Sequence, residues 1–263
     1  MTPPSDLSLS ELADRRVVVV VAHPDDEILG CGAFLGSLAD VRVVHVTNGS
    51  PLDPAAAKEH GFESPAAYAA ARRREAEAAL ALVDIGPDRI VRLDIVDQQV
   101  SRRMADVARI LAPMLRDADA VLSHAFEGGH PDHDAVALSV HAACRLAPRH
   151  LILVEMPFYH AGPNGWVRQC FLPRSGAGAE AILWLDAKQR SLKRRLVAAH
   201  VTQADVLDGF SLDAERFRRA PDYDFVSRPH TGDLLYERHA WNLTGAQWLE
   251  QASAALTELG LPC

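Results

Sequence analysis

The run Val-Val-Val-Val-Val-Ala at residues 17–22 constrains the fold of this chain more than any other segment. A strand with β-branched side chains on both faces is typical of a parallel sheet that helices cover on both sides. Further strand-like runs lie at residues 41–47, 89–95, 120–124 and 151–156. Helical patterns separate them, at residues 28–38, 66–83, 102–116 and 132–146. This alternation predicts an α/β fold: a Rossmann-like, doubly wound, mostly parallel sheet with helices on both faces.

The regular alternation ends after Pro157. Residues 157–180 are rich in Gly, Pro and aromatic residues, and we expect a loop there that covers one end of the sheet. A Pro- and Gly-punctuated segment predicts an earlier loop at 48–65. The remaining expected elements are a strand at 181–186, a helix at 187–200, an irregular stretch and a last helix at 245–259. We predict one domain, 1–263, with a core at about 16–200 and a loop-rich C-terminal extension, 201–263, packed on it.

The net charge and the cysteines exclude several classes of function. A formal net charge of −8 at pH 7 disfavours a broad basic surface for nucleic acid or anionic membrane. The four cysteines are widely scattered and form no CxxC pair, which argues against a disulfide framework and a cysteine zinc site. No apolar run is long enough to cross a bilayer, and the N-terminus lacks the pattern of a signal peptide. We therefore expect a cytoplasmic protein without membrane insertion.

Potential metal ligands follow the first strand directly, at His23, Asp25, Asp26 and Glu27. Ligand sites in open parallel sheets gather beyond the carboxyl ends of the strands. Histidine and carboxylate are ligands that zinc accepts, and a tight turn could bring His23 and Asp26 toward one point, with Asp25 beside the metal. The alternative is a helix N-terminus whose acidic first turn favours the helix dipole. Phosphate binding is disfavoured, because this turn offers acids and lacks G-x-G-x-x-G.

A second cluster follows the fourth expected strand, within residues 127–134. His130 and His133 stand three residues apart at the start of a helix, a spacing compatible with one or both facing a metal. Two His/Asp clusters at equivalent ends of a parallel sheet would converge on one site. The sequence therefore predicts a shared metal site. The isolated histidines are expected to be structural: His124, His141, His150 and His200.

Two strings of this sequence, AHPDDEILGCGA at 22–33 and GHPDHD at 129–134, closely resemble the motifs of the PIG-L/LmbE-like zinc-dependent N-deacetylases. The resemblance implies that His23, Asp26 and His133 bind one Zn²⁺ per chain, with Fe²⁺ as an alternative occupant of such a site. It further implies that Asp25 is the general base that takes the proton of a zinc-activated water.

The resemblance also implies roles for His130 and Asp132. His130 would stabilise the oxyanion or protonate the leaving amine. To act as an acid it must be cationic near neutral pH, and we expect Asp132 to orient it and to raise its pKa.

Weaker similarity extends over roughly residues 16–155 and implies substrate-binding residues. Arg72 and Glu75 fit the family's Arg-x-x-Glu helix, and Asp97 fits its aspartate after the third strand. Arg72 and Asp97 would hold hydroxyl groups of the substrate. Gln98 departs from the glycine of many relatives, so the sugar-contacting loop is expected to differ.

The function that the resemblance implies is removal of an acetyl group from the amide nitrogen of an amino sugar or sugar-bearing small molecule. Two alternatives stay open: a deacylase of a non-sugar N-acyl amide, and a non-catalytic protein that holds structural zinc. The expected partner is a small N-acetylated substrate, and the sequence leaves open whether the chain forms a homo-oligomer. Candidates for the pocket mouth are Glu155, Phe158, Tyr159, His160, Trp166, Phe171, Trp184 and His230, without assigned roles.

Overall fold

The computed structural model describes residues 7–239, 241 and 243–262. Its main sheet has seven strands in the order β3-β2-β1-β4-β5-β9-β8. The first five in the chain are parallel: β1 Arg16–Val21, β2 Asp40–Pro51, β3 Ile90–Asp97, β4 Ala120–His124 and β5 Ile152–Met156. Strand β9 (Ala214–Arg219) is antiparallel to both of its neighbours, β5 and the edge strand β8 (Ala181–Trp184). The predicted fold class, a mostly parallel α/β sheet between helices, is confirmed.

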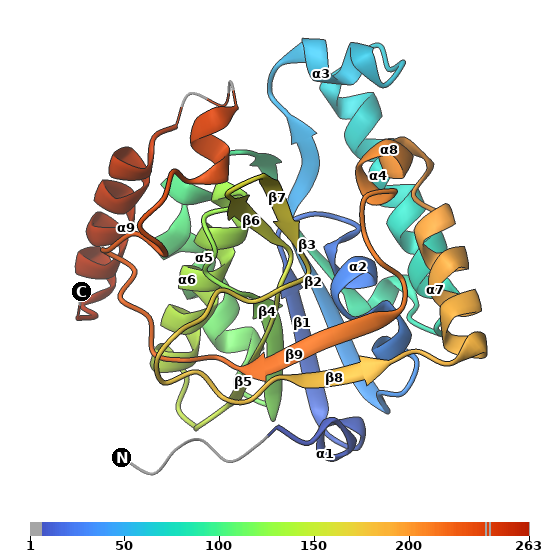
Figure 1. The fold of residues 1–263 in the computed structure, drawn as a ribbon, viewed down its shortest axis with the longest axis horizontal. Coiled ribbons are helices and arrows are strands. Elements are labelled where there is room, and N and C mark those ends of the chain that lie inside the picture. Colours follow the sequence, from blue (N-terminus) through green and yellow to red (C-terminus); the bar gives the residue numbers. More distant parts are fainter. Residues whose placement is uncertain (1–6, 240, 242, 263) are drawn as a thin grey trace.

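Helices cover both faces of the sheet (Figure 1). One layer contains α2 (Asp26–Leu35), α4 (Pro65–Ala81) and α7 (Ala187–Ala198). The other contains α5 (Met104–Met114), α6 (Pro131–Leu146) and α9 (Gly245–Leu259). The remaining helical elements are short: α1 Leu9–Ala13, α3 Pro54–Glu59, η1 Pro87–Arg89, η2 Val100–Arg102, η3 Val201–Gln203, α8 Ala204–Leu207 and η4 Leu235–Arg238. None of the helices in the described ranges combines the length and the apolar character needed to cross a membrane.

Strand β1 explains why the chain needs two helical layers. Successive side chains point to opposite faces of a strand. Val18 and Val20 pack in the apolar cluster under α5, α6 and α9, whereas Val17, Val19 and Val21 pack in the cluster under α2, α4 and α7. The continuous valine run is therefore the sequence of a strand with a hydrophobic core on each side.

Three segments that were expected to be irregular contain regular elements. Strand β2 continues to Pro51 and α3 follows it inside the expected loop at 48–65. The expected loop at 157–180 contains the hairpin of β6 (Tyr159–Gly162) and β7 (Gly165–Arg168). Strand β9 lies inside the stretch that was expected to be irregular and pairs within the main sheet. Its sequence, AERFRR, escaped prediction because its buried positions include charged side chains as well as Phe217.

Candidate active site and metal centre

The two histidine-containing motifs meet because β1 and β4 are neighbours in the sheet. Both strands are parallel, with Val17 opposite Ala120, so their carboxyl ends lie at the same edge. Helix α2 begins just after β1 and α6 just after β4. His130 is the N-cap of α6, with Pro131 at the first helical position, which fixes where that helix starts. The second motif thereby faces the first across one edge of the sheet.

Three residues of the two motifs form a small triangle of donor groups, in which both carboxylate oxygens of Asp26 stand at one corner. Nδ1 of His23 lies 3.2 Å from Oδ2 of Asp26 and 3.2 Å from Nε2 of His133, and that Nε2 lies 3.3 Å from Oδ1 of Asp26. Ligand atoms bound about 2.0–2.1 Å from a tetrahedral zinc ion stand about 3.4 Å apart. All three residues are buried. The structure therefore brings together the three predicted ligands at a spacing compatible with one tetrahedral cation.

The charges of this triangle also favour a cation. Burial would raise the pKa of Asp26, but His133 and His23 hold that pKa well below its ordinary value. Burial would lower the pKa of His23, yet Asp97 and Asp26 raise it well above the usual range. A proton on His23 thus compensates the buried carboxylates in the metal-free chain. A cation bound between the three residues would compensate the same carboxylates in place of that proton.

Asp97 contacts His23 rather than standing apart as a substrate group. Its Oδ1 lies 3.0 Å from Nε2 of His23, whereas Nδ1 of the same ring faces Asp26 and His133. Carboxylates that accept the second ring N–H of a metal-ligating histidine fix its tautomer and orientation. Asp97 also lines the pocket described below, so this position does not exclude the predicted contact with substrate.

Asp25 is held from two sides beside the triangle. Nη2 of Arg72 donates to its Oδ2 at 2.8 Å, and Oε2 of Glu27 accepts its backbone N–H at 3.1 Å. The backbone φ of Asp25 is 152°, a value that L-residues rarely adopt, and these two contacts help to maintain it. Burial raises the pKa of Asp25 to about 7 despite the nearby Arg72. A carboxyl group with a pKa near neutrality suits a general base.

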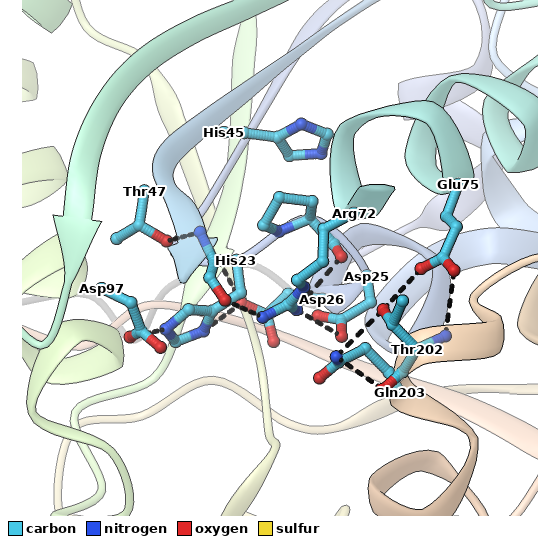
Figure 2. A network of polar contacts seen from close by, with 12 residues as sticks. His23, Asp25, Asp26, His45, Thr47, Arg72, Glu75, Asp97, Thr202 and Gln203 are labelled. Carbon is cyan, nitrogen blue, oxygen red and sulfur yellow. Dashed lines mark hydrogen bonds and ion pairs between the residues drawn. The ribbon is translucent and has the colours of Figure 1, made fainter. Parts of the chain in front are cut away.

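Arg72 makes its contacts within the protein (Figure 2). Besides Asp25, its guanidinium donates to the carbonyl oxygens of Gly49 and, at 3.3 Å, Pro24. A Cβ at position 49 would lie 2.6 Å from Cζ of Arg72, and Gly49 has a φ of +69°, so glycine is required there. The predicted substrate-binding arginine lines the pocket, but its observed hydrogen bonds hold the carboxylate of Asp25.

The predicted pairing of Asp132 with His130 is wrong in its details. The carboxylate of Asp132 accepts the backbone N–H groups of Gln98 at 2.6 Å and Val100 at 3.0 Å. The hydrogen bond between the two residues comes from the backbone N–H of Asp132, which donates to Nδ1 of His130 at 3.1 Å, and a carboxylate oxygen of Asp132 lies within 4.8 Å of a ring nitrogen of His130. Burial, and next the neighbouring His23, lower the pKa of His130 well below the usual range, opposite to the predicted direction. Because Nδ1 of His130 accepts this hydrogen bond, the ring hydrogen of a neutral His130 lies on Nε2.

A pocket of about 210 Å³ opens onto these groups. Its polar end carries the clustered residues His23, Asp25, Asp26, Arg72, Asp97, His130 and His133. Its apolar wall comes from α2, the β6–β7 hairpin and the segments near 203–210 and 241. Tyr159 and Trp166 stack at 4.9 Å between ring centroids, and Trp241 lies 4.6 Å from the ring of His130. A larger cavity, about 500 Å³, lies near Cys144 and Pro221 and contains none of the clustered residues.

The other candidates for the pocket mouth divide into two groups. Tyr159 and Trp166 line the pocket as expected. The remaining candidates do not line it: Glu155, Phe158, His160, Phe171, Trp184 and His230. Glu155 instead forms a buried ion pair with Arg218.

His124 is the isolated histidine that lies closest to the triangle. Its Nε2 accepts the backbone N–H of Ala22 at 2.8 Å, and its ring stacks on His133 at 4.1 Å. Its Nε2 also lies 3.5 Å from Oδ2 of Asp26, so Asp26, His124 and His133 form a second group of closely spaced potential ligands. The structural role of His124 stays a prediction.

Several lining residues were missed by the sequence reasoning. They are Leu29, Gln203, Val206, Leu207, Phe210 and Trp241. All but Leu29 lie in the irregular part of the chain, where no periodicity relates them to the two motifs. Only the fold brings this segment over the carboxyl ends of β1 and β4.

Comparisons with known proteins agree with this geometry. Residues 18–144 match the family described as PIG-L: GlcNAc-PI de-N-acetylase, which confirms the predicted resemblance and the predicted class of enzyme. The match spans both motifs. No curated protein matches the chain.

Solved structures share the fold at low sequence identity. An A40926 pseudoaglycone deacetylase is 23% identical with a TM-score of 0.62, and the match covers 78% of this chain and 96% of that one. A deacetylase of the teicoplanin biosynthesis pathway is 19% identical with a TM-score of 0.62, covering 80% and 99%. The N,N'-diacetylchitobiose deacetylase from Pyrococcus horikoshii is 18% identical with a TM-score of 0.58, covering 86% and 91%.

Proposed function

Because residues 18–144 match the PIG-L family, we propose that the chain is a zinc-dependent N-deacetylase of an amino sugar or a sugar-bearing small molecule. The observation that carries the proposal is the triangle of donor atoms from His23, Asp26 and His133 next to the buried carboxylate of Asp25. It supports a hydrolase in which a cation and a general base lie on one side of a pocket.

His23, Asp26 and His133 would hold the metal through Nδ1, the carboxylate and Nε2, respectively. A zinc ion bound there would polarise the amide carbonyl and acidify a water molecule. Three protein ligands leave a fourth tetrahedral position open, as in other catalytic zinc sites. Fe²⁺ would suit the same donors, so we propose zinc as the native metal with Fe²⁺ as the alternative.

The chain's own residues would move the protons. Oδ2 of Asp25 is occupied by Arg72, so we assign the removal of the water proton to Oδ1. As the hydroxide oxygen adds to the carbonyl carbon, the Nε2–H of neutral His130 donates to the developing oxyanion. Asp25 then returns its proton to the amide nitrogen as the carbon–nitrogen bond breaks. The products are acetic acid, which ionises to acetate in water, and a free amine, and Asp25 is again a carboxylate.

The shape of the pocket supports a sugar as the part of the substrate that carries the amide. One end presents the carboxylates of Asp25 and Asp97, and the wall presents the stacked rings of Tyr159 and Trp166. Hydroxyl groups suit the first surface, and the apolar face of a sugar ring suits the second. Two structural relatives, an A40926 pseudoaglycone deacetylase and an N,N'-diacetylchitobiose deacetylase, support the assignment as an N-deacetylase of a small molecule.

The proposal extends to the whole chain as one domain. Segment 201–263 supplies β9 to the main sheet and the residues of the pocket wall near 203–210. We therefore propose that 201–263 folds together with residues 16–200. A cytoplasmic location and a homo-oligomer stay predictions.

The test combines metal analysis with a panel of acetylated substrates. We expect purified protein with one equivalent of zinc to release acetate from at least one N-acetylated sugar. Faster cleavage of N-acyl amino acids or peptides would favour the non-sugar deacylase. Bound zinc without cleavage of any amide would favour the non-catalytic alternative. Absence of both metal binding and hydrolysis would contradict the proposal.

A further inference from the structure

We propose that Gln203 binds the substrate, its side-chain oxygen Oε1 accepting a hydrogen bond from a hydroxyl group of the sugar. The inference rests on the proposed deacetylase function and adds a residue that determines specificity. Gln203 ends η3 and lies far in sequence from both motifs, yet it lines the same pocket as Asp25 and Arg72. It is 6% exposed.

The contacts of the side-chain nitrogen fix the orientation of this amide. Nε2 of Gln203 donates to the carbonyl oxygen of Thr202 at 2.9 Å, and it lies 2.6 Å from Oη of Tyr68 and 3.1 Å from Oγ1 of Thr202. A carbonyl oxygen only accepts, so the NH₂ group must face Thr202 and the amide cannot be reversed. Oε1 therefore points the other way (Figure 2). Among the described residues, no group donates to it.

A second pair of contacts holds the segment that presents Gln203. Glu75 accepts the backbone N–H of Thr202 at 2.9 Å and its hydroxyl at 2.6 Å. Because the Thr202 hydroxyl donates to Glu75, its oxygen is free to accept from Gln203. Glu75 lies on α4, one turn after Arg72. One helix thus positions the group that holds the general base and the segment that carries Gln203.

This arrangement selects the chemistry of the ligand. With both amide hydrogens directed at Thr202 and Tyr68, Gln203 offers the pocket an acceptor only. The nearby carboxylates of Asp25 and Asp97 are acceptors as well. A hydroxyl group supplies the missing donor, whereas a phosphate or carboxylate would leave Oε1 unpaired and face like charge. A substrate without that hydroxyl leaves a buried acceptor without a partner, which costs binding free energy.

The decisive variant is Gln203→Leu, which keeps the approximate shape and removes the acceptor. The probe is the N-acetyl sugar that the wild type cleaves best, together with its single-deoxy analogues. We expect KM for the parent sugar to rise about three- to tenfold, with a smaller change in kcat. One deoxy analogue should be handled alike by the wild type and the variant, since neither makes the hydrogen bond. Unchanged KM and unchanged discrimination among the analogues would overturn the inference.

Thr202 provides a matched pair of positioning variants outside the pocket lining. Thr202→Val removes the hydroxyl that receives Nε2 and binds Glu75, whereas Thr202→Ser retains it. We expect Thr202→Val to raise KM for the parent sugar in the same direction as Gln203→Leu, and Thr202→Ser to restore it. Equal KM values for the two Thr202 variants would contradict the positioning role.

Binding to the metal-free protein separates this inference from the proposed function. Calorimetry with the deacetylated amino sugar needs no catalysis, and we expect Gln203→Leu to weaken binding by the same three- to tenfold factor. If Gln203→Leu alters the folding of the protein, the same calorimetric measurement is made with Thr202→Val instead. If the wild type binds the sugar but cleaves no amide, the proposed function fails alone. If it cleaves the sugar and both variants bind it normally, only the role of Gln203 fails.

Discussion

Two regions of this molecule bury charged side chains, and they do so in opposite ways. At the carboxyl ends of β1 and β4, Nδ1 of His23 lies 3.2 Å from Nε2 of His133, each also facing a carboxylate oxygen of Asp26. Under β9, Nζ of Lys193 donates at 2.6 Å to Oε1 of Glu215. The first set brings together groups of the kinds that can bind a metal ion, whereas the second pairs a donor with an acceptor.

The difference shows what distinguishes a site from a structural ion pair. Lys193 also donates to the carbonyl oxygen of Leu29, and Glu215 accepts the N–H groups of Ala33 and Phe34. The charges of Lys193 and Glu215 compensate each other, and this ion pair needs no further charged group. The cluster at β1 and β4 holds several acceptors within one coordination sphere and needs a cation or a proton between them. Burial of charged side chains, which both regions share, does not by itself distinguish a candidate metal site from a structural ion pair.

The largest expected effect comes from removing a ligand of the first region. His133→Ala takes away one of three predicted metal ligands, so the variant should lose bound zinc and nearly all deacetylase activity. Metal content by mass spectrometry and acetate release are the measurements. The exposed His150→Ala is the control and should keep both. A His133→Ala protein with full zinc content would break the comparison.

Asp25→Asn should separate chemistry from metal binding within the same region. The side chain keeps its size and an oxygen for Arg72 but loses the basic oxygen, so kcat should fall about 10²- to 10⁴-fold. Zinc content should stay at one equivalent, since Asp25 is not among the three predicted ligands. Wild-type turnover in this variant would rule out Asp25 as the general base.

Lys193→Met tests the second region. It leaves Glu215 as a buried charge without its partner, and the free energy of unfolding should fall by about 3–5 kcal/mol. Adding Glu215→Gln removes that charge and should restore part of the loss, because the amide oxygen still accepts one of the two backbone N–H groups that Glu215 accepts. Urea unfolding measures both variants. A Lys193→Met protein as stable as the wild type would show that the pair is not a structural ion pair of this kind.

A third kind of buried group, neither ligand nor ion pair, gives the smallest effect. Burial lowers the pKa of His200 to about 4, and neither ring nitrogen has a hydrogen-bond partner among the described residues. The ordinary histidine pKa is about 6.5, so its contribution is fully present above that pH and is lost as pH falls toward 4, by up to about 3 kcal/mol. His200→Leu should flatten the pH dependence of unfolding over this range. An identical slope in variant and wild type would contradict this.

The parts predictable from sequence were those with strong local signals. The valine run of β1, the βα alternation and the two motifs each follow from short segments, and β4 and α9 have the predicted bounds. The convergence of His23, Asp26 and His133 follows from a general property of parallel sheets rather than from their spacing. The hydrogen bonds of Arg72 and Asp132 depended on loop geometry that the sequence does not encode locally.

The unpredicted parts depend on long-range pairing. Strand β9 carries charged residues at buried positions, and these are tolerated only because Lys193 and Glu155 lie opposite Glu215 and Arg218. Periodicity of apolar residues cannot reveal such a strand. Gln203 lines the pocket, and Glu75, far away in the sequence, holds the neighbouring Thr202. No sequence motif identifies strand β9 or the position of Gln203.

The most direct test of the account is a crystal structure of the protein with one equivalent of zinc, with the ion located by anomalous scattering. The account predicts one ion about 2.0–2.2 Å from Nδ1 of His23, the carboxylate of Asp26 and Nε2 of His133. It also predicts that Asp25 lies beside the ion without binding it. An ion held elsewhere, or side chains of these three residues that turn away from a common point, would contradict it.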